Sequence, residues 1–325
     1  MKKALIFSAA VCGISWIAAL VFHLTTGFTG LEGGLEAVAK YRTFAMFYMF
    51  LPAIVALLLR ALEGRASVRR PHALRVKVGF GNDPMLKFRP RWSWLVAILL
   101  VPVMVALSIA ISSLFAEVVG MKEGMLAMMA ANGADNLPAE SMAEFDKLTN
   151  GILLTITLIS GLFAGVTINA LFAFGEEYGW RAYMVDALRG RKFVPSALLI
   201  GVVWGLWHFP LILMGHNSYS NRPLGVAMMV LFCVLAGVVE LYFVCKSGTV
   251  WPAVFIHGVI NAIAGVSVIM IPSGDTLLTG MTGLVGAASM VVIIALLWLY
   301  DRFVSHDNIF GSTLGRSLDR ATPEQ

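Results

Sequence analysis

The sequence predicts an all-α polytopic membrane protein, built as a bundle of about eight transmembrane helices. Two observations of composition support this fold class: 58% of the 325 residues are apolar and only 13% are charged, against roughly a quarter charged in an ordinary soluble domain. The third is that the apolar residues gather in stretches of about 20 residues, the length that crosses the hydrocarbon core. A soluble domain is not expected, because the gaps between these stretches are short.

The expected spans follow one another along the whole chain. The first comes after Lys2 and Lys3 and could instead be a cleaved signal peptide, but the apolar run is long and no small-residue cleavage site follows it. Eight spans are the simplest count that the apolar stretches allow, at about 20 residues each. They are residues 4–21, 44–59, 93–115, 153–174, 196–214, 224–244, 250–270 and 278–300.

The charges of the loops predict the orientation. Residues 60–91 carry nine basic side chains and two acids, whereas residues 117–150 carry six acids and two lysines. Because short loops rich in Lys and Arg stay in the cytoplasm, both termini are expected there, in a plasma or inner membrane. The net charge of +5 belongs mostly to the basic loop. We therefore expect contact with anionic lipid and no nucleic-acid partner.

Three segments are expected along the chain. Residues 1–150 hold three spans with the basic loop and the acidic outer loop, residues 151–270 hold four spans that carry all the polar motifs, and residues 271–325 hold the last span and a cytoplasmic tail. The three cysteines have no paired spacing and are expected to be packing residues. Residues 121–129 are rich in Met and are expected to form either an interfacial helix or a mobile loop.

Ionisable residues inside the spans are the most informative feature, since such groups are expensive in a membrane and usually functional. Glu177 and Arg181 are one helical turn apart, in the order that favours an ion pair. Glu176 lies about 100° around the same helix and about 18 Å from its cytoplasmic end. Asn169, seven residues earlier, lies on nearly the same face as Glu176.

Two further helices carry polar residues at comparable depth. His208 lies about 20 Å from the cytoplasmic side by the same rise per residue, and Trp204 precedes it by one turn. His257 is reached from that side too, and Asn261 follows one turn deeper on the same face. We therefore expect three helices to meet around one polar cavity.

The residue types in this cavity suit peptide-bond hydrolysis. A carboxylate with an imidazole can hold and deprotonate a water, and a second imidazole with an amide can stabilise the oxyanion that forms. The ion pair of Glu177 and Arg181 is expected to hold the turn that aims Glu176.

A catalytic zinc held by Glu176, His208 and His257 is the competing interpretation. The chain lacks HExxH, so direct water activation, with no cofactor, is preferred over zinc. Glu240, in the sixth span, is expected to be either a functional group or a buried partner for a donor.

These motifs resemble those of the CPBP intramembrane proteases, the group of CAAX proteases and bacteriocin-processing or self-immunity proteins. Residues 175–181, Gly-Glu-Glu-Tyr-Gly-Trp-Arg, resemble the EExxxR signature. Residues 204–208 resemble the FxxxH motif, with Trp204 in place of Phe, and residues 257–261 resemble HxxxN. The resemblance covers about residues 150–265.

The resemblance implies a helical bundle with a conical cavity open to the cytoplasm. It assigns the general base to Glu176, water positioning to His208, the oxyanion site to His257 with Asn261, and support to Glu177 and Arg181. The function expected is an intramembrane endopeptidase acting on a membrane-associated protein or peptide, with a prenylated or CAAX-like substrate as one alternative. A non-catalytic immunity or scaffold protein of the same fold is the second alternative. A proton-coupled transporter is less favoured, because no internal repeat is found.

Overall fold

The computed structural model describes residues 1–28, 30, 34–68, 83–131 and 138–322. Within these ranges the chain is helical and forms no β-strand. Six helices are long and apolar enough to cross a membrane, and the bent pair α6 and α7, which meet at 98°, brings the count to seven. The expected all-α polytopic membrane fold is confirmed, with fewer unbroken spans than the eight expected.

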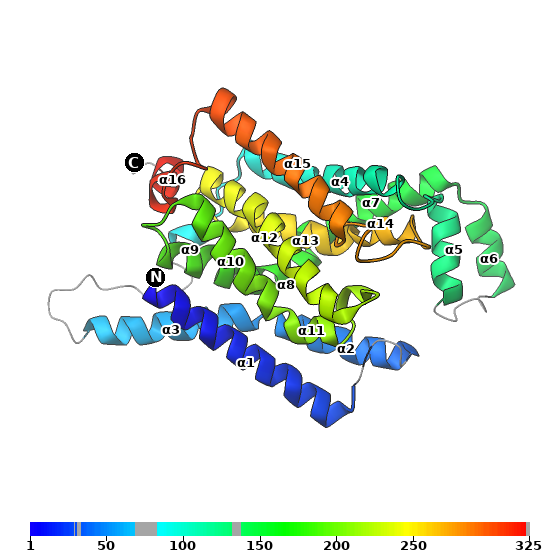
Figure 1. Ribbon diagram of the computed structural model, residues 1–325, viewed down its shortest axis with the longest axis horizontal. Helices are drawn as coiled ribbons and strands as arrows, with labels where there is room; N and C mark the ends of the chain where they lie inside the picture. Colours follow the sequence, from blue (N-terminus) through cyan, green and yellow to red (C-terminus); the bar gives the residue numbers. More distant parts are fainter. Residues whose placement is uncertain (29, 31–33, 69–82, 132–137, 323–325) are drawn as a thin grey trace.

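The helices are named as in Figure 1. In chain order they are α1 (Lys2–Thr26), α2 (Gly34–Tyr48), α3 (Leu51–Val68), α4 (Trp92–Ser112), α5 (Met121–Ala131), α6 (Ala139–Asp146), α7 (Asn150–Val166), α8 (Ile168–Glu177), η4 (Tyr178–Tyr183), α9 (Met184–Ala187), α10 (Phe193–Trp207), α11 (Phe209–Leu213), α12 (Arg222–Ser247), α13 (Trp251–Ile263), α14 (Gly265–Ile269), α15 (Leu284–Tyr300), η6 (Asp301–Ser305) and α16 (Leu314–Ala321).

Two of the expected spans are broken in the middle, besides the short interruptions between α2 and α3 and between α13 and α14. The fourth is interrupted at Thr167, between α7 and α8. The fifth is interrupted at His208, between α10 and α11, because Pro210 has no backbone N–H to donate to the carbonyl of Leu206 four residues earlier. That carbonyl instead accepts a hydrogen bond from Trp16 Nε1 of α1, at 3.2 Å. The last span begins with α15 at Leu284, later than expected, after a loop that contains Pro272 and several glycines.

The helix that carries Glu176 runs on beyond the apolar stretch, as expected. It passes from α8 through the wider π-helical turn η4 into α9, and it ends at Leu188. Single π-helical turns inside α-helices are frequent at functional sites. Here the wider turn contains Trp180 and Arg181, directly after Glu176 and Glu177.

The centre of the molecule is formed by α8, α10, α12 and α13 (Figure 1), with α1 to α3 along one side and α4 and α15 along the other. The N-terminus and α16 lie at one end of the molecule, and the arm of α5 and α6 lies at the opposite end. Glycines let the central helices approach closely. A Cβ at Gly258 of α13 would collide with the carbonyl oxygen of Gly165 of α7.

Other expectations have mixed outcomes. Residues 121–131 form a helix, which agrees with the first of the two alternatives, an interfacial helix or a mobile loop. That this helix lies at the membrane surface stays a prediction. Cys233 and Cys245 are buried and Cys12 is half-buried, and all three are free thiols. Part of the basic loop, residues 69–82, lies outside the described residues.

Candidate active site

The ionisable residues singled out in the sequence are buried in the middle of the central helices. Glu177 and Arg181 are 0% exposed and Glu176 only 2%. His208 and His257 are buried as well. Charged groups are almost never fully buried unless they are paired. Each therefore needs a partner, and most of the partners come from this same set.

Glu176 is held by two other helices. Its Oε2 accepts a hydrogen bond from Trp204 Nε1 of α10, at 2.7 Å. Its Oε1 lies 4.0 Å from His257 Nε2 of α13. A phenylalanine at position 204 could not donate this hydrogen bond. The departure from the FxxxH pattern therefore adds a polar contact to Glu176 in addition to shaping the pocket.

Glu177 orients two partners with one oxygen. Its Oε1 accepts from Arg181 Nη1 at 3.1 Å, which is the one-turn ion pair expected from the spacing. The same oxygen lies 2.8 Å from His257 Nδ1. The ring N–H of His257 is therefore directed to Glu177, so that Nε2 faces Glu176. Glu177 thus positions a histidine as well as the turn, which the sequence spacing alone did not indicate.

Arg181 joins this helix to α12. Its second Nη forms an ion pair with Glu240, and its guanidinium lies over the Trp204 ring, 4.4 Å from the ring centroid. Gly237, one turn before Glu240, leaves room for it, because a Cβ there would lie 3.1 Å from Arg181 Nη2. Glu240 is therefore a buried partner of a donor, the guanidinium of Arg181, which was one of the two alternatives expected for it.

His208 joins the cluster through Trp204. It caps α10, and its Nδ1 lies 2.9 Å from the backbone oxygen of Trp204. Since that carbonyl can only accept, Nδ1 carries the proton and Nε2 is the free acceptor. The thiol of Cys233 lies 3.9 Å from the same Nδ1, and the ring of His216 stacks at 6.0 Å.

Asn261 is placed differently from the other expected site residues. It follows His257 by one turn of α13, but its side chain is exposed, and no other described residue forms a side-chain hydrogen bond with it. Asn169, expected near Glu176, donates instead to the backbone oxygen of Gly258, at 3.3 Å, and so ties α8 to α13. The structure thus brings Glu176, Glu177, Arg181, Trp204 and His257 into one contact network and leaves Asn261 at its open edge.

Sequence reasoning did not single out His216 or Cys233. Both contact His208 from elements that the sequence treats as a loop or as a uniformly apolar span. His216 stands directly after Gly215, at the start of the polar segment 216–222, and nothing in the sequence there indicated a contact with His208. Nothing in the sequence around Cys233 indicated a contact with a histidine.

The donor atoms suited to a metal are arranged differently from the set expected for zinc. Within the described residues, the group whose ligand atoms all lie within 4.8 Å of one another is Glu177, Glu240 and His257. Arg181 already lies against both of these carboxylates. A metal cation there would be repelled by the guanidinium, so this group does not fit a metal ion.

Comparison with known proteins agrees with the motifs. The family described as "Type II CAAX prenyl endopeptidase Rce1-like" matches residues 145–263, which include Glu176, His208, His257 and Asn261. A curated relative, CAAX prenyl protease 2 of Methanococcus maripaludis, is 31% identical over 93 residues. That match covers 26% of this chain and 34% of the relative, so about a third of the relative's length is matched. Residues 145–263, which carry the three motifs, are thus similar to this endopeptidase family, and part of the chain is similar to this relative.

Proposed function

We propose that this protein is an intramembrane endopeptidase in which Glu176 activates a water molecule. The observation that carries the proposal is the placement of this carboxylate, buried between the indole N–H of Trp204 and Nε2 of His257. The 4.0 Å between Glu176 Oε1 and His257 Nε2 is longer than a hydrogen bond, and a shared water can bridge such a gap.

In the proposed reaction Glu176 takes a proton from the water as its oxygen attacks the carbonyl carbon of the substrate. The proton then passes to the departing amine nitrogen as the C–N bond breaks, so that a carboxylic acid and an amine are released. We assign water positioning to His208, whose Nε2 is the free acceptor. We assign the oxyanion to Asn261, whose exposed amide is accessible to a substrate, and to His257, which as the imidazolium carries a second N–H on Nε2 besides the one directed to Glu177.

Glu177, Arg181 and Trp204 support this arrangement without reacting. Glu177 directs the ring of His257, while Arg181 keeps Glu177 and Glu240 from being left as unpaired buried charges. No cofactor is needed in this mechanism. Activity that chelators abolish and zinc restores would overturn that part of the proposal.

The substrate proposed is a membrane-associated protein or peptide, cleaved near its C-terminus or at a bilayer boundary. The relative named CAAX prenyl protease 2 makes a prenylated or CAAX-like substrate one candidate. We further propose a cell membrane with both termini in the cytoplasm. The common position of the N-terminus and α16, opposite α5 and α6, supports this topology.

The direct test is cleavage of a membrane-anchored peptide by the purified chain in phospholipid vesicles. Glu176→Gln keeps the size of the side chain but cannot accept the proton, and we expect cleavage to fall by about a hundredfold or more. Glu140→Gln, at an exposed acid of α6, is the matched control and keeps full activity. Normal cleavage by Glu176→Gln would refute the proposed mechanism.

A further inference from the structure

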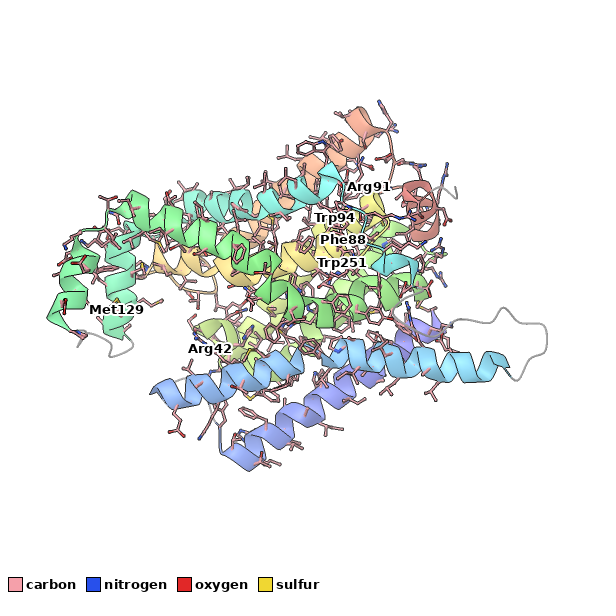
Figure 2. All side chains as sticks on the ribbon, turned by 180° about the vertical axis from the view of Figure 1, so that it is seen from behind. Arg42, Phe88, Arg91, Trp94, Met129 and Trp251 are labelled. Carbon is pink, nitrogen blue, oxygen red and sulfur yellow. The ribbon has the colours of Figure 1, made fainter. Side chains whose placement is uncertain are left out.

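A polar cavity, separate from the candidate active site, lies at one end of the helix bundle. It has a volume of about 190 Å³ and is lined by Arg91, Lys246, Asp307 and Arg320, among others. These residues come from the start of α4, the end of α12, the loop after η6, and α16. In Figure 2, Arg91 lies at the beginning of α4, beside α16. The cavity is therefore built from segments that are far apart in the sequence.

The charges in this cavity do not cancel. Lys246 forms an ion pair with Asp307. Arg91 donates to the backbone oxygen of Ala321, and Arg320 donates to the backbone oxygen of Asp307. Both carbonyls are neutral acceptors, and neither guanidinium has a carboxylate partner among the described residues. Two positive charges are left over at the cavity.

The loop that carries Asp307 is held in a strained conformation. Its neighbours His306 and Asn308 have φ of 55° and 51°, in the left-handed region that residues other than glycine rarely adopt. Burial alone would raise the pKa of Asp307, but Lys246 and Arg320 lower it below its usual value. Such strain persists only where the surroundings impose it, which indicates a fixed arrangement around the cavity.

The position of the cavity indicates what fills it. It lies where α4 begins and where α12 and the helix of α15 and η6 end, and these are three of the candidate membrane spans. Exposed aromatic side chains stand within four residues of Arg91 or Asp307 along the chain: Trp92 is 81% exposed, Phe88 62% and Phe303 64%. Aromatic residues at the ends of spans are typical of the headgroup level of a bilayer. The guanidinium groups therefore lie at the depth of lipid phosphates.

We propose that this cavity binds the phosphate group of an anionic phospholipid through Arg91 and Arg320. Guanidinium groups match phosphate oxygens with two parallel N–H donors. A headgroup of net negative charge is favoured over zwitterionic phosphatidylcholine, because the choline of the latter brings a cation close to the two guanidinium groups. A bound lipid would link α4 to α16 and so fix the C-terminal helix at the membrane surface. This proposal is independent of the proteolytic activity.

The experiment titrates the full-length protein, purified in detergent, with phosphatidylglycerol, phosphatidylcholine or inorganic phosphate, and counts bound molecules by native mass spectrometry. Wild type is expected to bind one phosphatidylglycerol at least tenfold more tightly than phosphatidylcholine. Arg91→Gln with Arg320→Gln is expected to lose about thirtyfold in affinity, because each basic side chain near an anionic headgroup contributes a factor of about five. Arg191→Gln, which removes an exposed charge that does not line the cavity, keeps wild-type affinity.

A variant that is expected to increase lipid affinity distinguishes the loss of a binding site from misfolding. Asp307→Asn removes the one acid among the described residues that line the cavity. It is expected to tighten phosphatidylglycerol binding by about fivefold, which a misfolded protein would not do. Equal binding of the two lipids, or an equal loss in Arg191→Gln, would overturn the proposal. Binding of inorganic phosphate without binding of phosphatidylglycerol would assign the cavity to a free anion and overturn the lipid assignment.

Discussion

Trp204 is the residue where this chain departs from the FxxxH pattern, and its indole N–H contacts Glu176 directly. Trp204→Phe would keep an aromatic ring beneath Arg181 while removing this hydrogen bond. Because a hydrogen bond to a charged group contributes about 1.5–3 kcal/mol, we expect kcat to fall by at least about tenfold with a smaller change in KM. The measurement is steady-state cleavage of the membrane-anchored peptide.

The control for this substitution is Trp251→Phe. Trp251, labelled in Figure 2, donates a comparable hydrogen bond to the backbone oxygen of Leu86 instead of to a residue of the site. It is expected to lose some stability and to keep its kcat. An unchanged kcat in Trp204→Phe would show that the hydrogen bond to Glu176 does not matter for the reaction.

Arg181 pairs with two buried carboxylates, so its removal has a large cost. Arg181→Met is expected to lower the free energy of unfolding by about 3–5 kcal/mol, because it leaves Glu177 and Glu240 without a cation. The double variant Arg181→Met with Glu240→Gln is expected to recover part of that loss, since one uncompensated charge is removed. Thermal unfolding in detergent of the two single variants and the double variant gives the coupling free energy between Arg181 and Glu240. Strictly additive losses would contradict this interpretation.

At the scale of elements, α13 carries His257 and must lie close to α7. Gly258→Ala would place a methyl group against the backbone oxygen of Gly165. A backbone atom cannot turn aside, so we expect a loss of about 1–3 kcal/mol in stability together with reduced cleavage. Gly265→Ala, at the start of α14 where nothing lies within 4 Å of the new Cβ, is the matched control. Similar unfolding temperatures for the two variants would show that the close approach is not required.

The position of the helices could be predicted from the sequence much better than their continuity. Apolar stretches located the spans because burial in lipid depends on length and composition, which a sequence shows directly. The break at His208 was missed because the mean hydropathy of a stretch does not respond to a single proline. Pro210 in that stretch was the signal that could have predicted it. The later start of α15 was missed because Leu278 and Met281 extend the apolar stretch into the loop before it, although two glycines interrupt that stretch.

Within the candidate site, contacts along one helix could be predicted from the sequence, and contacts between helices could not. Glu177 and Arg181 were paired correctly because residues one turn apart on a helix must be neighbours. The contact of Arg181 with Glu240, and that of Trp204 with Glu176, join separate helices. Contacts between helices depend on how the helices pack, and the spacing of residues within one helix does not indicate that packing.

At the scale of the whole molecule, the topology follows from the two ends of the bundle. The helices α16 and α6 lie at opposite ends (Figure 1), and they carry the exposed residues Arg316 and Glu140 respectively. In a variant without native cysteines, we expect Glu140→Cys to react with a membrane-impermeant maleimide in intact cells. Arg316→Cys is expected to react only after the membrane is permeabilised. The reverse pattern would contradict the proposed orientation.

The central claim is that the buried carboxylate of Glu176 activates water and does not attack the substrate itself. Single-turnover cleavage in ¹⁸O-labelled water tests it most directly. Activation of water by Glu176 predicts that the new carboxylate of the product carries one ¹⁸O after the first turnover, while Glu176 remains unlabelled. An unlabelled product together with ¹⁸O in the side chain of Glu176 would contradict it, because that pattern requires an acyl intermediate on the glutamate.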